Sequence, residues 1–177
     1  MSKKPFVTLP QIEEMVQTYP TPFHLYDEKG IRENARLVQK AFSWNKGYRE
    51  YFAVKATPTP RLLQILKEEG CGVDCSSLTE LMMSDACGFS GSEIMFSSND
   101  TPVEDFELAH KLNAIINLDD ITHIEYLERI IGHIPERISC RYNPGGVFSL
   151  GESKEGFQVM DTPGDSKYGM TRAQMTE

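Results

Sequence analysis

The sequence lacks the features that would point to a membrane, an export route or a nucleic acid. No apolar run approaches the roughly 20 residues that span a bilayer, and the two lysines near the start precede no apolar signal segment. Basic residues form no cluster, and 26 acidic residues outnumber 18 basic ones, which gives a net charge of −8. We therefore expect a cytoplasmic protein with no nucleic-acid and no membrane partner.

Motifs for nucleotides and metals are also missing. No GxGxxG follows the first expected strand, and no Walker-type GK[ST] is present. The four histidines are scattered, which gives little support to a metal site or a catalytic triad. Among four cysteines, the spacing of Cys71 and Cys75 is a weak signal for zinc, and we expect reduced thiols packed like small apolar residues.

The chain does contain a clear β-α alternation. It has 177 residues, 40% of them hydrophobic, which is enough for a domain with a core. The expected strands are residues 23–27, 48–55, 72–77, 93–98, 114–118 and 136–143. The expected helices are residues 28–44, 59–70, 78–88, 101–112 and 119–131. This pattern predicts an α/β fold with a parallel sheet, either doubly wound or closed as a barrel.

The sequence changes character after Asn143. Residues 144–166 contain five glycines and two prolines with little periodicity, and so long a loop inside a compact domain is uncommon and usually functional or disordered. A helix-like pattern then begins at residue 171 and ends with the chain at Glu177. Because a domain rarely ends one turn into an amphipathic helix, we expect the chain to be part of a longer protein.

Lys55 is the first candidate for chemistry. It closes an expected strand just before a helix, which predicts a place at the carboxyl edge of the sheet, where sites form. Its neighbours Ala53, Val54 and Ala56 are apolar. Desolvation lowers the pKa of an amine and makes a neutral nucleophile available for Schiff-base chemistry. The alternative is a lysine whose charged end reaches out to water.

Polar side chains follow the next expected strand at the same edge. Asp74 lies one β-α unit after Lys55, and a carboxylate there would hold the charge of a nearby protonated nitrogen. Ser77 and Glu80 follow Asp74 at a spacing that also suits a capping box at the start of the next helix. Both roles are compatible with the sequence.

The later strands also end in polar residues. Arg141 falls in a run that we expect to be buried, and a buried guanidinium needs a carboxylate, a phosphate or a phenolate. That partner is either a ligand or a structural aspartate or glutamate. For residues 97–99 and 119–120, which end two other strands, we favour helix capping.

Several segments together resemble the N-terminal part of the diaminopimelate decarboxylases. They are PFHLYDEKGIRENARLVQKAF, YFAVKATPTPRLLQILKEEGCGVDCSSLTEL, CRYNPGG and SKYGM, and the resemblance runs from about Pro22 to Gly169. Its most specific pieces are FAVKA and GVDCSSLTEL at their mutual distance. These enzymes belong to the fold type III enzymes of pyridoxal 5′-phosphate (PLP), with alanine racemase and the ornithine and arginine decarboxylases as relatives.

The resemblance implies a fold and a site. About five of the eight strands of a PLP-binding β/α (TIM-like) barrel would be present in residues 46–177, preceded by an N-terminal segment over residues 1–45, and the rest of the barrel and a C-terminal β-domain would be absent. Lys55 matches the lysine that binds PLP. Asp74, Ser77 and Glu80 match a D-x-x-S-x-x-E pattern whose acidic members line the cofactor pocket, and Arg141 matches an active-site arginine.

The resemblance also implies a function. The whole enzyme would be a homodimer that converts meso-diaminopimelate, a small amino acid, to L-lysine and CO2. The family's ring-stacking histidine, phosphate-binding glycines and pyridine-pairing glutamate are not in this sequence, so we expect the chain alone to be inactive. The alternatives are a decarboxylase for ornithine, arginine or carboxynorspermidine, a non-catalytic half-barrel that associates with a partner, and a cofactor-free Schiff-base aldolase.

Overall fold

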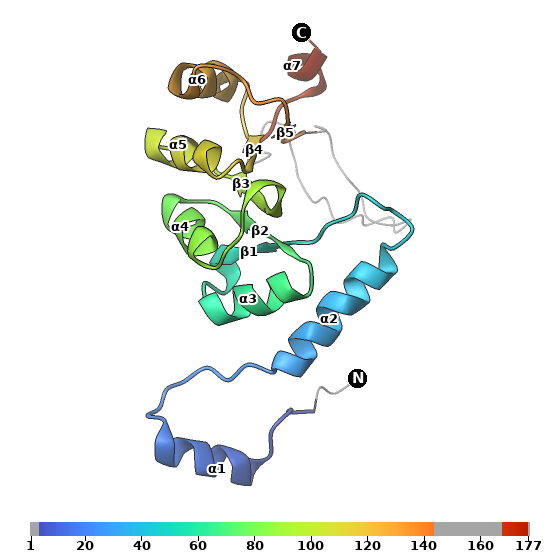
Figure 1. The fold of residues 1–177 in the computed structure, drawn as a ribbon, viewed down its shortest axis with the longest axis vertical. Coiled ribbons are helices and arrows are strands. Elements are labelled where there is room, and N and C mark those ends of the chain that lie inside the picture. Colours follow the sequence, from blue (N-terminus) through green and yellow to red (C-terminus); the bar gives the residue numbers. More distant parts are fainter. Residues whose placement is uncertain (1–3, 144–167, 177) are drawn as a thin grey trace, which may run out of the picture.

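Five parallel strands form one sheet in which the spatial order of the strands is their order along the chain (Figure 1). The computed structural model describes residues 4–143 and 168–176, so the glycine-rich run over residues 144–166 lies outside the described residues. The strands are β1 (Tyr51–Ala53), β2 (Gly72–Cys75), β3 (Ile94–Ser97), β4 (Ile115–Leu118) and β5 (Ile138–Cys140). A doubly wound sheet would reverse its strand order part-way, so the unbroken order favours the barrel arrangement.

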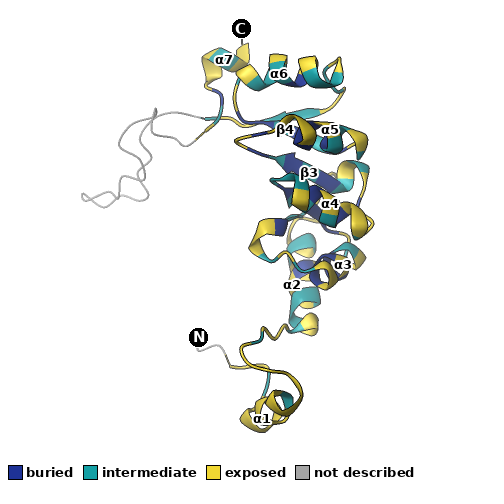
Figure 2. Cartoon of the chain, turned by 90° about the vertical axis from the view of Figure 1, so that its left-hand side faces the viewer, coloured by how far each residue is buried: buried dark blue, intermediate teal, exposed yellow. Residues whose placement is uncertain are grey.

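Four helices, α3 (Pro60–Glu68), α4 (Leu78–Ala86), α5 (Val103–Lys111) and α6 (Thr122–Ile131), follow β1 to β4 in turn and cover one face of the sheet (Figures 1 and 2). Helices α1 (Leu9–Thr18) and α2 (Glu28–Ala41) precede the sheet, and α7 (Arg172–Thr176) follows it. Helix α3 begins and ends close to the residues that its sequence predicts. Thr59 is the N-cap residue and Pro60 occupies the first turn, while Gly70 just past the end adopts a φ of +83°, which favours glycine.

The core lies between the sheet and its helices. Side chains alternate along a strand, and Val73, Cys75, Ile94, Phe96, Ile116 and Leu118 are each fully buried on the helix-covered face. From α5, Phe106 packs edge-on against Phe96 with ring centroids 6.0 Å apart. Burying one such side chain contributes about 1.5–3 kcal/mol. The opposite face of the sheet carries polar side chains, among them Asp74, Ser97 and Asn117.

The N-terminal region differs from the sequence prediction in three ways. Residues 23–27 form no strand and pair with no strand of the described sheet, and an isolated strand would leave its backbone groups unpaired. The strand expected over residues 48–55 is shorter: β1 covers three residues, and Lys55 sits in the 3-10 turn Val54–Ala56 that follows it. Helix α1, with a capping box between Thr8 and Gln11, was not predicted at all.

Helix α2 is joined to α3 by a network of charged side chains. Glu69, just past α3, accepts hydrogen bonds from Arg32 Nη1 at 2.9 Å and from Arg36 Nε at 2.6 Å. Arg32 also bonds Glu28 and Glu68. By contrast, none of the ten residues of α1 is buried, and Figure 2 shows this helix standing apart from the sheet. Within the described residues, no helix combines the length and the apolar character needed to cross a bilayer.

Candidate active site

A polar cavity of about 450 Å³ opens at the carboxyl ends of the strands. Lys55, Asp74 and Arg141 line it, together with Ser97, Asn99 and other short polar side chains. These three predicted residues come from the ends of β1, β2 and β5, and parallel strands bring their carboxyl ends to the same edge of a sheet. The structure therefore brings three of the five predicted site residues together in one cavity.

Lys55 is exposed in this cavity. Its 3-10 turn directly follows β1, and the turn is closed by a 3.1 Å hydrogen bond from Thr57 N to Val54 O. Val54 is completely buried, whereas the next side chain is turned to the open face of the sheet. The apolar surroundings expected around Lys55 are therefore not found among the described residues, because the apolar neighbour points into the helix-covered core.

Asp74 has a buried carboxylate oxygen with an unmet hydrogen-bond capacity. Oδ1 is inaccessible to solvent and has no hydrogen-bond partner among the described residues, which is rare for a buried polar atom. Burial raises the pKa of Asp74, the positive charge of Lys55 lowers it, and the negative charge of Glu80 raises it further. An acceptor of this kind at the cavity wall suits a cationic or hydrogen-bond-donating group of a ligand.

The side chains of Ser77 and Glu80 form hydrogen bonds at the start of α4. Ser77 is the N-cap residue and accepts a hydrogen bond from Glu80 N at 3.4 Å. The Glu80 carboxylate reaches back and accepts from Ser76 N at 2.8 Å and from Ser76 Oγ at 3.1 Å. Neither Ser77 nor Glu80 lines the polar cavity. The capping alternative thus accounts for both side chains, and a cofactor role for them stays a prediction.

Arg141 is not buried, contrary to the expectation from its sequence context. Its side chain is 43% exposed, and its Nη1 donates to Asp119 Oδ2 at 3.3 Å. The expected strand over residues 136–143 ends at Cys140, so Arg141 leaves the sheet at the rim of the open face. Its guanidinium lies over the ring of Tyr168, 5.7 Å from the centroid. The sequence left two kinds of partner open for Arg141, a ligand or a structural carboxylate. The structure shows a structural carboxylate, that of Asp119.

The capping roles expected for the later strand ends hold in only one case. Asp120 accepts hydrogen bonds from Thr122 N at 2.9 Å and Thr122 Oγ1 at 2.7 Å, so it satisfies the first backbone N–H of α6, although the N-cap residue itself is Ile121. For residues 97–99 the expectation is wrong, because the N-cap of α5 is Pro102. Ser97 and Asn99 face the polar cavity instead.

Two residues that contact the cavity-lining side chains were not predicted from the sequence to have a role in the site. Asp119 is almost fully buried and bonds both Arg141 and Asn117. Asn117 also donates to Ser97 Oγ at 3.3 Å. The signal for Asn117 was its alternation with Ile116 and Leu118, which places it on the opposite face of the strand from these core residues.

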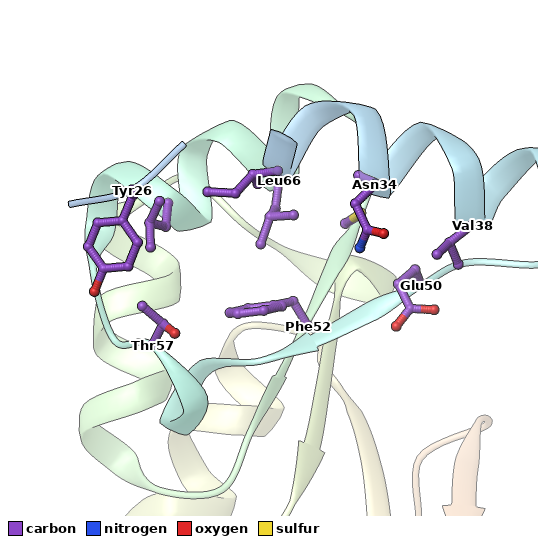
Figure 3. Close-up of a pocket in the computed structure, with 11 residues that line it drawn as sticks. Tyr26, Asn34, Val38, Glu50, Phe52, Thr57 and Leu66 are labelled. Atoms are coloured by element: carbon purple, nitrogen blue, oxygen red, sulfur yellow. The ribbon is translucent and has the colours of Figure 1, made fainter. Parts of the chain in front are cut away.

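A second, apolar cavity of about 320 Å³ lies between α2, α3 and β1. Figure 3 shows Phe52 from β1 on one side of it, with Leu66 from α3 and Val38 from α2 around it. Its buried thiol, Cys71, has a pKa raised mainly by burial, so it is held protonated. This cavity has no amine, so the polar cavity remains the better candidate for chemistry.

The comparison with protein families identifies the domain. The family model described as pyridoxal-dependent decarboxylase, pyridoxal binding domain, matches residues 28–177. The chain belongs to this decarboxylase family. Its five parallel strands match the N-terminal part of the PLP-binding barrel of fold type III decarboxylases, which confirms the predicted fold class.

Individual relatives of this decarboxylase domain are similar over most of the chain. Protein TabA of Pseudomonas amygdali pv. tabaci is 38% identical over 95% of this chain and 37% of its own length. The diaminopimelate decarboxylase of Thermoplasma acidophilum is 34% identical over 80% of this chain and 33% of its own length. The chain thus spans about a third of the length of these curated relatives.

Solved structures of decarboxylases are also similar to this chain. The diaminopimelate decarboxylase of Helicobacter pylori complexed with L-lysine has a TM-score of 0.64 and 32% identity, over 75% of this chain and 34% of that one. The lysine decarboxylase of Selenomonas ruminantium has a TM-score of 0.66, over 73% of this chain and 35% of that one. At 21% identity it shows the fold alone.

The described residues fit the cofactor that the family name implies. A PLP molecule offers an aldehyde, a ring nitrogen, a phenol oxygen and a phosphate. The cavity presents an exposed amine at Lys55, an unpaired buried carboxylate oxygen at Asp74 and a guanidinium at Arg141. Each has the charge or reactivity to meet one of those groups.

Proposed function

We propose that this chain carries part of the cofactor site of a PLP-dependent amino-acid decarboxylase, with Lys55 as the covalent anchor. The observation that carries the proposal is the joint presence of Lys55, Asp74 and Arg141 in one polar cavity at the carboxyl edge of the sheet. The membership of the chain in the pyridoxal-dependent decarboxylase family supports it. Residues 46–177 would form the cofactor-binding part, and residues 1–45 the N-terminal segment.

The proposed roles follow from the chemistry of each side chain. When bound, PLP supplies an electron sink for the electron pair that remains on the substrate carbon when CO2 leaves. Lys55 would hold the cofactor through Nζ, and the Asp74 carboxylate would face a cationic nitrogen. Arg141 would bind an anionic oxygen of the ligand. Ser77 and Glu80 would support the site indirectly by fixing the start of α4, close to Asp74.

For the substrate we propose meso-diaminopimelate, which the whole protein would convert to L-lysine and CO2 as a homodimer. The support is the similarity of about a third of the residues to diaminopimelate decarboxylases, over most of this chain. The stronger match to protein TabA leaves room for a different amino acid. Substrates therefore have to be compared side by side, with L-ornithine, L-arginine and L-lysine as competitors.

The anchor is tested by reduction. The protein is incubated with PLP, treated with borohydride and digested, and the modified peptide is located by mass spectrometry. We expect the label on Lys55, and its loss in Lys55→Ala. Lys67 is a matched control: Lys67→Ala removes a lysine that bonds Gly88 O and Glu93 on the far side of α3, and should keep the label. Labelling of other lysines to the same extent would sink the assignment.

The substrate is tested by CO2 release. With PLP present, we expect the whole protein to release CO2 from meso-diaminopimelate faster than from the other three amino acids. Faster release from one of those would replace the substrate but keep the reaction class. Labelling of Lys55 without CO2 release from any of them would contradict the decarboxylase proposal.

A further inference from the structure

Asp119 is a buried carboxylate that contacts Arg141, a residue of the polar cavity, and the sequence predicts only a capping role for it. It follows β4 directly, and its side chain is 1% exposed. Oδ2 accepts from Arg141 Nη1 at 3.3 Å, and Oδ1 accepts from Asn117 Nδ2 at 3.2 Å. Its backbone oxygen accepts from Gly169 N at 3.0 Å. Asp119 therefore connects the ends of β4 and β5 with the segment around Gly169.

Stability alone does not explain why a carboxylate occupies this position. Burying a charge costs free energy unless it is paired and hydrogen-bonded, and buried ion pairs are often no more stabilising than apolar residues of similar volume. Arg141 is 43% exposed, so its own charge is partly solvated and does not require a buried partner. The buried carboxylate does have one evident effect, which is to restrict where Arg141 can be.

The contacts of Arg141 fix its guanidinium at the cavity. Asp119 holds Nη1 from one side, and the ring of Tyr168 lies 5.7 Å from the guanidinium carbon. The Asp119 carboxylate is itself oriented by Asn117, which is bonded to Ser97 on the neighbouring strand. A long, flexible side chain is thereby held beside Lys55 and Asp74 before any ligand arrives, and such preorganisation lowers the entropy cost of binding.

We propose that Asp119 is a positioning residue of the Lys55 site, which holds Arg141 so that its guanidinium meets an anionic oxygen of the bound ligand. The inference rests on the proposed function, since PLP is the ligand by which it is tested. Asp119 acts through Arg141 and does not touch the reacting atoms. Asn117 acts one step further out, through Asp119.

The first test compares two adjacent aspartates. Asp119→Asn keeps the shape but removes the charge that holds Arg141, whereas Asp120→Asn changes an exposed residue that caps α6. PLP binding is measured by equilibrium dialysis, without substrate. We expect the dissociation constant to rise about tenfold in Asp119→Asn, the usual scale for a hydrogen bond to a charged group, and to stay unchanged in Asp120→Asn. An unchanged constant in Asp119→Asn overturns the inference.

The second test asks whether Asp119 acts through Arg141. In an Arg141→Ala background, we expect Asp119→Asn to have no further effect on the PLP dissociation constant, because the residue that it positions is gone. Equal effects in both backgrounds would mean that Asp119 influences the site by another route. A purely structural role would instead lower the Tm of the cofactor-free protein in Asp119→Asn and leave the dissociation constant unchanged.

Two controls separate this inference from the proposed function and from misfolding. If borohydride fails to label Lys55 in the unmodified protein, the proposed function fails, and the inference fails with it. If labelling succeeds but the two variants at residues 119 and 120 bind PLP alike, only the inference fails. Should Asp119→Asn not fold, Asn117→Ala provides the same comparison. It removes one bond to Asp119, and we expect a smaller rise in the dissociation constant in the same direction.

Discussion

At the scale of single residues, the cavity holds groups whose environment works against the stability of the fold. Asp74 is the clearest case, because its Oδ1 is buried with no hydrogen-bond partner among the described residues. Burial raises its pKa above the ordinary value, so the folded protein binds a proton there more tightly than the unfolded chain does. The free energy of unfolding therefore falls as the pH rises from the pKa of Asp74 in the unfolded chain to its higher pKa in the folded protein.

This gives a prediction for Asp74→Asn. Near neutral pH the variant removes a half-buried charge, and we expect the Tm of the cofactor-free protein to rise by about 2–4 °C, which corresponds to about 1 kcal/mol for a chain of this size. Near pH 3 the gain should vanish, because the aspartate is then protonated in both states. Circular dichroism melts at the two pH values check this.

The control for Asp74 is Asp100→Asn. Asp100 lines the same cavity but is exposed, so its substitution should leave the Tm unchanged at both pH values. We also expect Asp74→Asn to weaken PLP binding while it stabilises the fold, because the proposed site loses a carboxylate. A lower Tm at neutral pH would show that attraction to Lys55 outweighs the cost of burial.

The sequence predicts a site residue when its role follows from the local pattern around it, and fails when the role depends on a distant residue. Lys55 and Asp74 were found because a strand end followed by a helix locates a side chain at the carboxyl edge of a parallel sheet. Asp119 was not found, since its partner Arg141 lies 22 residues further along the chain and capping is the commoner role for an aspartate after a strand. A contact between two strand ends depends on tertiary packing, which a local pattern does not contain.

At the scale of elements, α2 is held to the domain by charges as well as by apolar contacts. Glu69 is the centre of the network, with its side chain 8% exposed and bonded to both Arg32 and Arg36. These hydrogen bonds, led by that from Arg36, lower the pKa of Glu69 to about 2. A depressed pKa in an acid contributes stability above its unfolded value of 4.5 that is lost as the pH falls towards about 2.

We therefore predict that Glu69→Gln loosens α2 from α3. Amide hydrogen exchange over Glu28–Ala41 should become severalfold faster at neutral pH, while exchange in the strands stays unchanged. In the unmodified protein the same helix should loosen first as the pH is lowered through 4.5. Mass spectrometry of the exchanged peptides measures both effects.

Glu33→Gln is the matched control for α2. Glu33 lies on the same helix, but it is 64% exposed and pairs only loosely with Lys29 at 3.8 Å, and exposed pairs of this kind contribute little. We expect exchange over α2 to match that of the unmodified protein. If Glu69→Gln and Glu33→Gln behave alike, the charge of Glu69 does not help to attach α2 to the domain.

At the scale of the whole molecule, the β-α alternation was enough to predict five parallel strands and their helices, and periodicity located the core. The alternation did not decide between a doubly wound sheet and a barrel, because strand order is a property of long-range pairing. The strand expected over residues 23–27 was wrong for the same reason: its residues have strand propensity, but a strand also depends on long-range pairing, and these residues pair with no strand of the described sheet.

The surface of the N-terminal region suggests self-association. Along α1, Leu9, Ile12, Val16 and Tyr19 follow a helical spacing and are all exposed, the least of them by 37%. An exposed apolar stripe on an amphipathic helix marks an interaction surface. The homodimer that we propose for this family member supplies a partner of matching chemistry, which is the equivalent stripe of a second copy.

We predict that the protein sediments as a concentration-dependent dimer, and that Ile12→Glu with Val16→Glu shifts it to monomer. No residue of α1 is buried within the chain, so the double variant should keep the circular dichroism spectrum of the unmodified protein, and any change in sedimentation then reports the interface. Glu13→Gln with Glu14→Gln, two exposed changes on the same helix, should leave the dimer intact. A dimer that survives the double substitution would assign association to another surface, and a monomer at every concentration would contradict the homodimer.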